Sequence, residues 1–345
     1  MIFHQFFDAA SSTYTYLMAK NRGADALLID PVMEQVDEYL KVLGQNHLRL
    51  IKVVDTHLHA DHFTGMSELR RLTGCINCAH EKNQSEKLAQ RLSDGDVIDI
   101  EGIELKVIYT PGHTNDSICL YDESHNMLFT GDTLFIRGNG RTDFQHGSSG
   151  DLYDSLMNKV FKLPDHTIIY PGHDYKGEQF SLLSREKLEN QRIHGKSRDE
   201  FIEIMDNLNL PRPEMMDVVV PANMLVGSTT DQEIAPNSSL NAKELSTRIR
   251  NPNVCLIDIR EEKEINQHGS IEGHINIPYQ EIDKALAEGG ELNLILKAGK
   301  EVIFMCAYGE RSSLALDKIG ADYIAQCCHL QDGFNDWKEN GLPSS

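Results

Sequence analysis

Residues 57–62 read His-Leu-His-Ala-Asp-His, and only Asp55 and Thr56 separate them from a run, 49–54, that reads as a β-strand. Three imidazoles and one carboxylate in so short a loop give it a high density of metal-binding groups. A loop of this kind needs a rigid scaffold behind it, which a sheet provides. The motif therefore predicts a β-sheet fold with a metal site at a strand end.

Three more strand ends carry groups of the same chemistry. His113 closes a Pro-Gly-His turn after the strand expected at 103–109, Asp132 follows a Thr-Gly pair, and His173 closes a second Pro-Gly-His turn. A single histidine in a chain of this kind is more often a packed or surface residue than a ligand. The recurrence at strand ends predicts one centre that suits Zn(II), Fe(II) or Mn(II).

Charge and composition exclude several classes of function. The chain of 345 residues carries 53 acidic and 33 basic side chains, a formal net charge of −20, which argues against nucleic acid and membrane surfaces as partners. No apolar run has the length of a membrane span, and the N-terminus does not resemble a signal peptide. The seven cysteines are odd in number and irregularly spaced, which favours free thiols. We therefore expect a cytoplasmic protein.

The pattern of the chain changes after about residue 230. Residues 228–239 are polar and contain proline and several serines and threonines, which is typical of a linker. Alternating helical and strand patterns follow, and these predict a small parallel α/β domain. We expect an N-terminal domain at 1–230, a linker at 231–240 and a C-terminal domain at 241–345.

The C-terminal part has one candidate nucleophile. Residues 301–312 read as an apolar strand that delivers Cys306 to a tight loop before a helix. Backbone amides of such a loop stabilise a thiolate and, later, an anionic persulfide, and Arg311 adds positive charge. The alternative is an inert buried cysteine.

The histidine motif with its two Pro-Gly-His turns and the Gly-Asp pair resembles the metallo-β-lactamase superfamily. That resemblance implies an α/β fold, an αββα sandwich, over about residues 1–230. It leaves two chemistries open. The full ligand set suits two zinc ions and thioester hydrolysis, as in glyoxalase II, whereas two histidines and one carboxylate suit a single Fe(II) with open positions for O₂ and substrate.

The segment 131–144, GDTLFIRGNGRTDF, is similar to persulfide dioxygenases and much less so to glyoxalase II. Segments 6–19, 173–177 and 215–223 are similar to the same family. The resemblance implies one Fe(II) per domain, held by His57, His113 and Asp132. Around this iron it implies supporting residues, which are also the alternative ligands of a second metal: His59, Asp61, His62 and His173.

The same resemblance implies a catalytic tyrosine, Tyr175, and several substrate contacts. Tyr175 matches a tyrosine near the iron, and Arg192 matches an arginine that binds a glutathione carboxylate. Arg137 and Arg141 are further candidates, because an arginine fork suits a carboxylate. Two residues depart from the family pattern: Asn139, where cysteine is frequent, and Asp116, where a small residue is frequent.

Segments 256–265, 269–278 and 331–341 resemble rhodanese signatures. This second resemblance implies that Cys306 carries sulfane sulfur, with Arg311 beside it, and that Asp258 and Arg260 belong to the structural signature.

Together these features predict a bifunctional sulfur enzyme. Its first domain would oxidise glutathione persulfide with O₂ to sulfite and glutathione, and its second would exchange sulfur with thiosulfate or glutathione. The direction of sulfur flow and the preferred thiol carrier are left open by the sequence. A homodimer is compatible with the resemblance, since superfamily members often pair.

Overall fold

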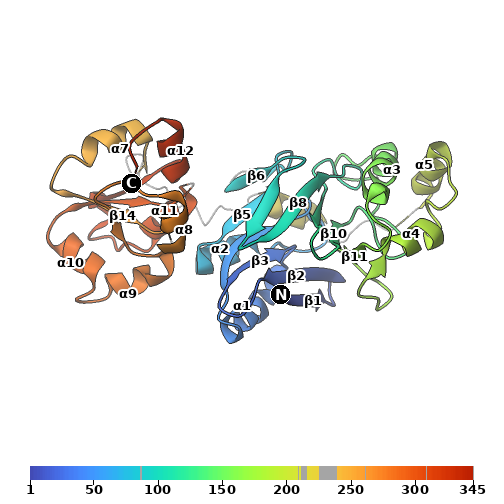
Figure 1. Cartoon of the computed structure of the whole chain (residues 1–345), viewed down its shortest axis with the longest axis horizontal. Coiled ribbons are helices and arrows are strands. Elements are labelled where there is room, and N and C mark those ends of the chain that lie inside the picture. Colours follow the sequence, from blue (N-terminus) through green and yellow to red (C-terminus); the bar gives the residue numbers. More distant parts are fainter. Residues whose placement is uncertain are drawn as a thin grey trace. The chain divides into compact units, whose positions relative to one another are not determined.

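The computed structural model describes residues 1–85, 88–208, 210, 216–224, 239–260, 262–307 and 309–344. The chain divides into two compact units (Figure 1). The first comprises Met1–Arg70 and Ile76–Ser228, and the second comprises Arg71–Cys75 and Thr229–Ser345. The described residues form two sheets in the first unit and one sheet in the second.

The first unit begins with a mixed sheet of six strands in the order β1-β2-β3-β4-β5-β6. The first three strands pair antiparallel, and β3, β4, β5 and β6 continue in parallel. Aromatic and β-branched residues fill β2, which suits a buried strand. The bounds are Ile2–Asp8, Thr13–Ala19, Asp25–Ile29, Arg49–Val54, Ile76–His80 and Gln90–Leu92.

A second sheet of six strands has the order β12-β11-β10-β9-β8-β7. Neighbours are antiparallel except β10 and β11, which pair in parallel. In chain order from β7 to β12, the bounds are Val97–Ile100, Ile103–Tyr109, Ile118–Asp122, Met127–Gly131, Ile168–Pro171 and Ser181–Leu182.

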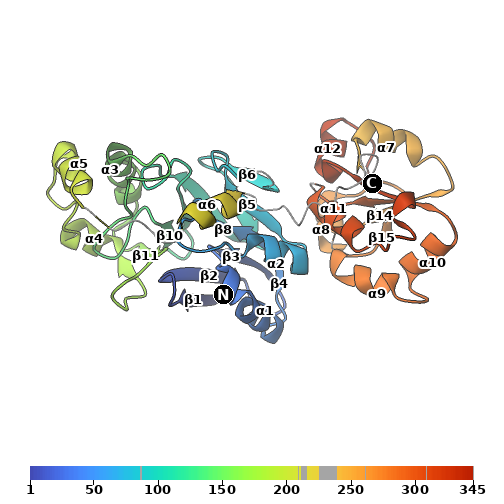
Figure 2. The ribbon, with the colours of Figure 1, turned by 180° about the vertical axis from the view of Figure 1, so that it is seen from behind.

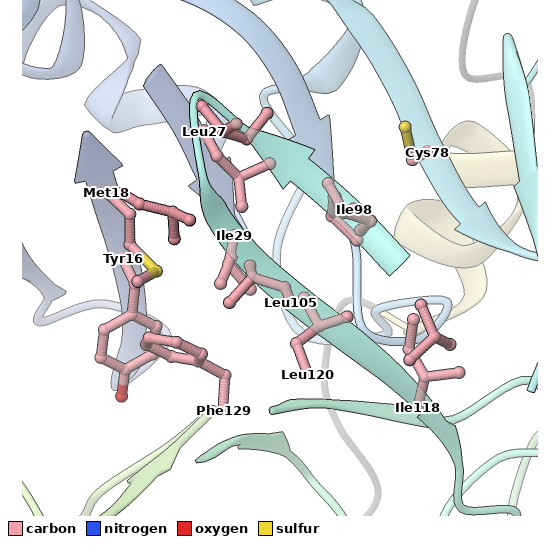
Figure 3. Close-up of a cluster of buried hydrophobic side chains, with 14 of the residues drawn as sticks. Tyr16, Met18, Leu27, Ile29, Cys78, Ile98, Leu105, Ile118, Leu120 and Phe129 are labelled. Carbon is pink, nitrogen blue, oxygen red and sulfur yellow. The ribbon is translucent and has the colours of Figure 1, made fainter. Parts of the chain in front are cut away.

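The two sheets pack face to face over one apolar core. Side chains of both sheets meet there, among them Tyr16 and Leu27 from the first and Leu105, Leu120 and Phe129 from the second (Figure 3). Alternation along β8 puts its apolar residues into this core and its charged ones toward solvent. The core fixes both sheets, so the loops at their strand ends have a rigid support.

Helices cover the outer faces of both sheets. Parallel strands need crossover connections, and α1 and α2 provide them between β3, β4 and β5, as α3 does between β10 and β11. On the second sheet, Leu152 and Leu156 of α3 pack with Phe201 of α5 against Leu128. The helices of the unit are Val36–Gln45, Met66–Thr73, Ser149–Asn158, Leu183–Glu189, Arg198–Asp206 and, for α6, Met216–Met224.

The second unit contains a five-stranded parallel sheet in the order β13-β17-β16-β14-β15. In chain order from β13, its strands are Ser239–Leu240, Val254–Asp258, Ile275–Asn276, Glu301–Met305 and Cys327–Leu330. The helices from α7 to α12 are Ala242–Arg248, Glu262–His268, Ile282–Leu286, Glu291–Lys297, Glu310–Asp317 and Gly333–Glu339.

A buried ion pair organises the loops of this sheet. Arg260 donates from Nε and Nη2 to the two carboxylate oxygens of Asp258, at 3.0 and 2.7 Å, and Ser270 donates to Asp258 at 2.5 Å. Arg260 also donates to the carbonyl of Gly269 at 2.9 Å and lies over the ring of Phe334. These contacts fit the structural role expected of Asp258 and Arg260.

The linker expected at 231–240 lies outside the described residues up to 238, and its last two residues form β13. The domain limits at 230 and 241 remain predictions. Within the described residues, no helix combines the length and apolar character that crossing a membrane requires.

Candidate functional site

Four of the expected site residues lie within four residues of the end of a core strand. His57 comes after β4, His113 after β8, Asp132 after β10 and His173 after β11. Ligand atoms of His57, His113 and Asp132 all lie within 4.8 Å of one another. His113 Nε2 is 3.5 Å from Asp132 Oδ2. Three loops far apart in sequence thus bring two imidazoles and a carboxylate to one point.

Hydrogen bonds fix which nitrogen each of these imidazoles presents. The Thr56 hydroxyl donates to Asp30 Oδ2 at 2.9 Å and lies 3.0 Å from His57 Nδ1. Since this hydroxyl has a single proton, it accepts from Nδ1–H of His57. His113 likewise donates from Nδ1 to the carbonyl of Arg141 at 2.6 Å. Both rings therefore keep a lone pair on Nε2, as metal ligands do.

Gly131 explains the Thr-Gly pair before Asp132. Its φ is +46°, a left-handed conformation that favours glycine, and a Cβ at this position would collide with the Thr56 hydroxyl. The glycine thus lets the Asp132 loop approach the residue that orients His57.

The cluster of predicted ligands has four further members, His59, Asp61, His62 and His173. Their side chains contact mainly one another and nearby carboxylates. His173 lies between two carboxylates, with Nδ1 2.7 Å from Asp132 Oδ1 and Nε2 2.8 Å from Asp61 Oδ2. The same oxygen of Asp61 is 3.0 Å from His62 Nδ1. His59 Nε2 faces Asp30 Oδ1 at 3.2 Å.

The pKa values of His57, Asp132 and His173 shift in different directions. Burial and the neighbouring His59 hold the pKa of His57 well below its ordinary value, so its imidazole is neutral. Burial would raise the pKa of Asp132, but His173 and His113 outweigh it and lower that pKa. Burial would lower the pKa of His173, but Asp132 and Asp61 raise it well above its ordinary value.

Two ring nitrogens of the cluster are buried without a hydrogen-bond partner, His59 Nδ1 and His62 Nε2. The rings of these residues lie 4.4 Å apart, and with Asp61 they form a second group of ligand atoms within 4.8 Å. Unpaired buried polar atoms are costly. This second group therefore has the chemistry to accept a cation.

A cavity of about 560 Å³ opens onto the first group. His113 and Asp132 line it, together with the predicted catalytic Tyr175 and the predicted substrate residues Arg137, Arg141 and Arg192. Tyr175 is 71% exposed, and its ring lies parallel to that of His173 with centroids 6.1 Å apart. The three predicted substrate residues and Tyr175 thus line the same cavity as two of the predicted ligands.

The three arginines of this cavity differ in their partners. Arg137 forms an ion pair with Glu178, and Arg141 donates to both carboxylate oxygens of Asp143 at 2.7 Å. Arg192 donates to the carbonyl of Asn139 at 2.6 Å, and no carboxylate of the described residues pairs with it. Burial lowers the pKa of Arg192. Arg192 is therefore the arginine best placed to bind an anionic substrate group.

The two departures from the family pattern are both buried. Asp116 Oδ2 accepts from the amide of Leu58, at 3.0 Å, and from Asn83 Nδ2, at 2.6 Å, so it supports the histidine loop. Asn139 donates to the carbonyl of Gly140 at 2.9 Å, while its Oδ1 has no partner.

Sequence reasoning missed Thr56, Asp30 and the supporting role of Asp116. The threonine directly precedes His57 and could have been noticed. Asp30 has no local signal, because only the pairing of β3 with β4 brings it beside the loop.

The second candidate site surrounds Cys306, which is 1% exposed at the end of β16. The amide of Gly309 donates to Cys306 Sγ at 3.1 Å, and Ser312 Oγ is 3.6 Å from the sulfur. Gly309 has a φ of +96°, and a Cβ there would collide with the carbonyl of Gln331. The loop thus depends on glycine to aim an N–H at the thiol.

Arg311, the predicted cation of this site, forms an ion pair with Glu264. It donates to both carboxylate oxygens of Glu264, at 2.8 and 2.6 Å. Burial would lower the pKa of Arg311, but Glu264 outweighs it and raises that pKa. Its charge is therefore largely compensated within the pair.

Comparison with known proteins identifies the family of each domain. A family model described as the metallo-beta-lactamase superfamily matches residues 9–173, and one described as a rhodanese-like domain matches residues 241–340. The protein named Persulfide dioxygenase ETHE1, mitochondrial, of Bos taurus is 40% identical over 230 residues, 67% of this chain and 90% of that relative. The chain belongs to the persulfide dioxygenase family.

Other proteins and solved structures are also similar to this chain. The crystal structure of ETHE1 from Myxococcus xanthus is 48% identical and covers 65% of this chain and 99% of its own, with a TM-score of 0.63. A metallo-beta-lactamase structure from Staphylococcus aureus, 25% identical, covers 96% of this chain and 99% of its own, with a TM-score of 0.59. The Hydroxyacylglutathione hydrolase of Pelagibacter ubique is 30% identical over 64% of this chain and 91% of that relative.

These findings confirm the predicted family and the predicted architecture, an αββα sandwich followed by a parallel α/β rhodanese domain. A persulfide dioxygenase family member with a rhodanese-like domain is an enzyme of sulfur metabolism, as predicted. The family implies a bound metal. The identity of that metal, its ligands and the substrate contacts stay predictions.

Replacing Gly309 by alanine should slow sulfur uptake by Cys306. The new Cβ would force the loop away from Gln331, and the thiolate would lose its aligned N–H donor. Loss of one such donor typically costs roughly 100-fold in rate. The measurement is the single-turnover rate of Cys306 persulfide formation by mass spectrometry. The control is Gly320→Ala, where a Cβ meets nothing within 4 Å; equal rates for both variants would contradict the role of Gly309.

Proposed function

We propose that the N-terminal domain oxidises glutathione persulfide with O₂ to sulfite and glutathione, using a single ferrous ion held by His57, His113 and Asp132. One observation carries this proposal: these three residues form a ligand group of their own, to which neither His59 nor His173 belongs. Two histidines and one carboxylate with open positions suit a non-haem ferrous centre that uses O₂.

The donor set fits such an ion. Both imidazoles keep a lone pair on Nε2 because their Nδ1 atoms are hydrogen-bonded to Thr56 and Arg141. Asp132 Oδ2 faces His113, while its Oδ1 is bound by His173. When bound, ferrous iron would supply the redox chemistry by which O₂ reacts with the persulfide sulfur.

The chain's own residues would bind and orient the persulfide. Arg192 offers an uncompensated guanidinium to a glutathione carboxylate, and Arg137 and Arg141 could join it by exchanging their present carboxylate partners. Tyr175 places a phenol hydroxyl, a hydrogen-bond donor, at the cavity wall beside His173. Such positioning holds the reacting sulfur in place and lowers the barrier.

In the rhodanese domain, we propose that the Cys306 thiolate attacks the outer sulfur of a donor. The sulfur–sulfur bond of the donor breaks, and its electron pair leaves with the donor, as sulfite if the donor is thiosulfate. The N–H of Gly309 stabilises the thiolate and then the Cys306 persulfide. Glutathione thiolate can then take the outer sulfur as glutathione persulfide. The reverse sequence converts sulfite to thiosulfate.

A glyoxalase II-like hydrolase with two zinc ions is the second candidate. The unpaired nitrogens His59 Nδ1 and His62 Nε2 favour it, because they form a second cation-binding group with Asp61. The similarity to a hydroxyacylglutathione hydrolase points the same way. Against it, both nitrogens of His173 already face carboxylates. A hydrolase would cleave S-lactoylglutathione and leave O₂ untouched.

Oxygen uptake separates the two domains. Anaerobically purified protein should consume O₂ with glutathione persulfide, and Asp132→Ala should abolish this because a ligand is lost. Cys306→Ser should keep the uptake with glutathione persulfide but lose the uptake that depends on thiosulfate and glutathione. An oxygen electrode makes both measurements. Undiminished uptake by Asp132→Ala would refute the proposed iron site.

Arg192→Ala should weaken binding of glutathione persulfide with little change in kcat. A charge-assisted hydrogen bond contributes about 1.5–3 kcal/mol, so KM should rise roughly tenfold or more. A persulfide of a small uncharged thiol should be unaffected. Arg185→Ala, at an arginine paired with Glu189 on the surface, serves as the control. If both variants raise KM equally, Arg192 has no specific role.

A further inference from the structure

Helix α6 contacts the histidine loop through the buried side chain of Asn223. Figure 2 brings α6 to the front of the first unit. Asn223, near the end of this helix, is 4% exposed. Its Nδ2 donates to the carbonyls of His59, at 3.1 Å, and His62, at 2.9 Å, and its Oδ1 accepts from the amide of Thr64 at 3.0 Å.

This contact has one possible amide orientation. Two carbonyls require the NH₂ side of Asn223, and an amide N–H requires its oxygen, so a flipped side chain would oppose all three groups. Ser85 donates to the carbonyl of Asn223 itself at 2.9 Å, which holds this end of the helix in place. The asparagine thus satisfies backbone groups of the loop that a neighbouring strand would satisfy in a sheet.

The loop is held from more than one side. Asp116 accepts from the amide of Leu58, and Gln145 donates to the carbonyl of Leu58 at 2.7 Å. These two contacts secure the start of the loop, next to His57. Asn223 secures the stretch from His59 to Thr64. Together these hydrogen bonds restrain the backbone of the loop from Leu58 to Thr64.

Resting on the proposed function, we infer that Asn223 is a positioning residue for the metal centre: by clamping the backbone from His59 to Thr64, it fixes the far end of the loop that begins at His57 and so limits how far this ligand can move from His113 and Asp132. Groups that orient metal ligands without touching the metal commonly affect its affinity by about 10- to 100-fold. The metal-binding unit then extends to α6, well beyond the segment 9–173 that matches the superfamily model.

The test compares Asn223→Ala and Asn223→Asp with wild type and with Val218→Ala, a 57% exposed position on the same helix. Aspartate keeps the size and the acceptor but removes both donated hydrogen bonds. Affinities for Fe(II) and for Zn(II) are measured on the metal-free full chain by competition with a chromogenic chelator. Hydrogen exchange of the amides at 57–64 and sulfur transfer by Cys306 are followed in parallel.

Both Asn223 variants should bind each metal roughly 10- to 100-fold more weakly and should lose protection at 57–64. Val218→Ala and sulfur transfer should be unchanged. Unchanged metal affinity of the Asn223 variants overturns the inference. This holds also if the variants unfold at a lower temperature, because Asn223 would then only stabilise the fold. The affinity for Zn(II) depends on the geometry of the loop and not on any reaction with O₂. This measurement therefore tests the role of Asn223 even if the wild-type protein does not consume O₂.

Discussion

The imidazole of His173 lies between two carboxylates, and this contact divides the predicted metal-binding residues into two sets. One nitrogen faces Asp132 and the other faces Asp61, so neither is left over for a metal in this arrangement. Asp132 keeps its second oxygen toward His113. One set is the group of His57, His113 and Asp132. The other set contains His173, Asp61 and His62, which hydrogen bonds join to one another. Under the proposed function, the first set would leave open positions for O₂ and sulfur on a bound iron.

The two chemistries of the chain use the same structural device. In each domain a core strand ends in a loop whose backbone is shaped by a glycine, Gly131 at the metal group and Gly309 at the thiol. The glycine allows a close approach that a Cβ would prevent. Reactive groups are thereby fixed by strands that are themselves fixed by the core.

The sequence could predict the parts of the sites that depend on short motifs. His57, Asp132 and Cys306 follow short apolar runs that read as strands, so their places at strand ends could be foreseen. The clamp by Asn223 could not, because 164 residues separate it from His59 and no spacing relates them. Nor could the partners of Arg137 and Arg311, which are set by how Glu178 and Glu264 fold back onto them.

The most direct test of this account is the metal content of the full chain, purified without oxygen and measured by elemental analysis together with the spectrum of its ferrous centre. The account predicts about one iron per chain, with activity rising in proportion to iron. A pair of zinc ions in a protein that hydrolyses thioesters and does not consume O₂ would contradict it.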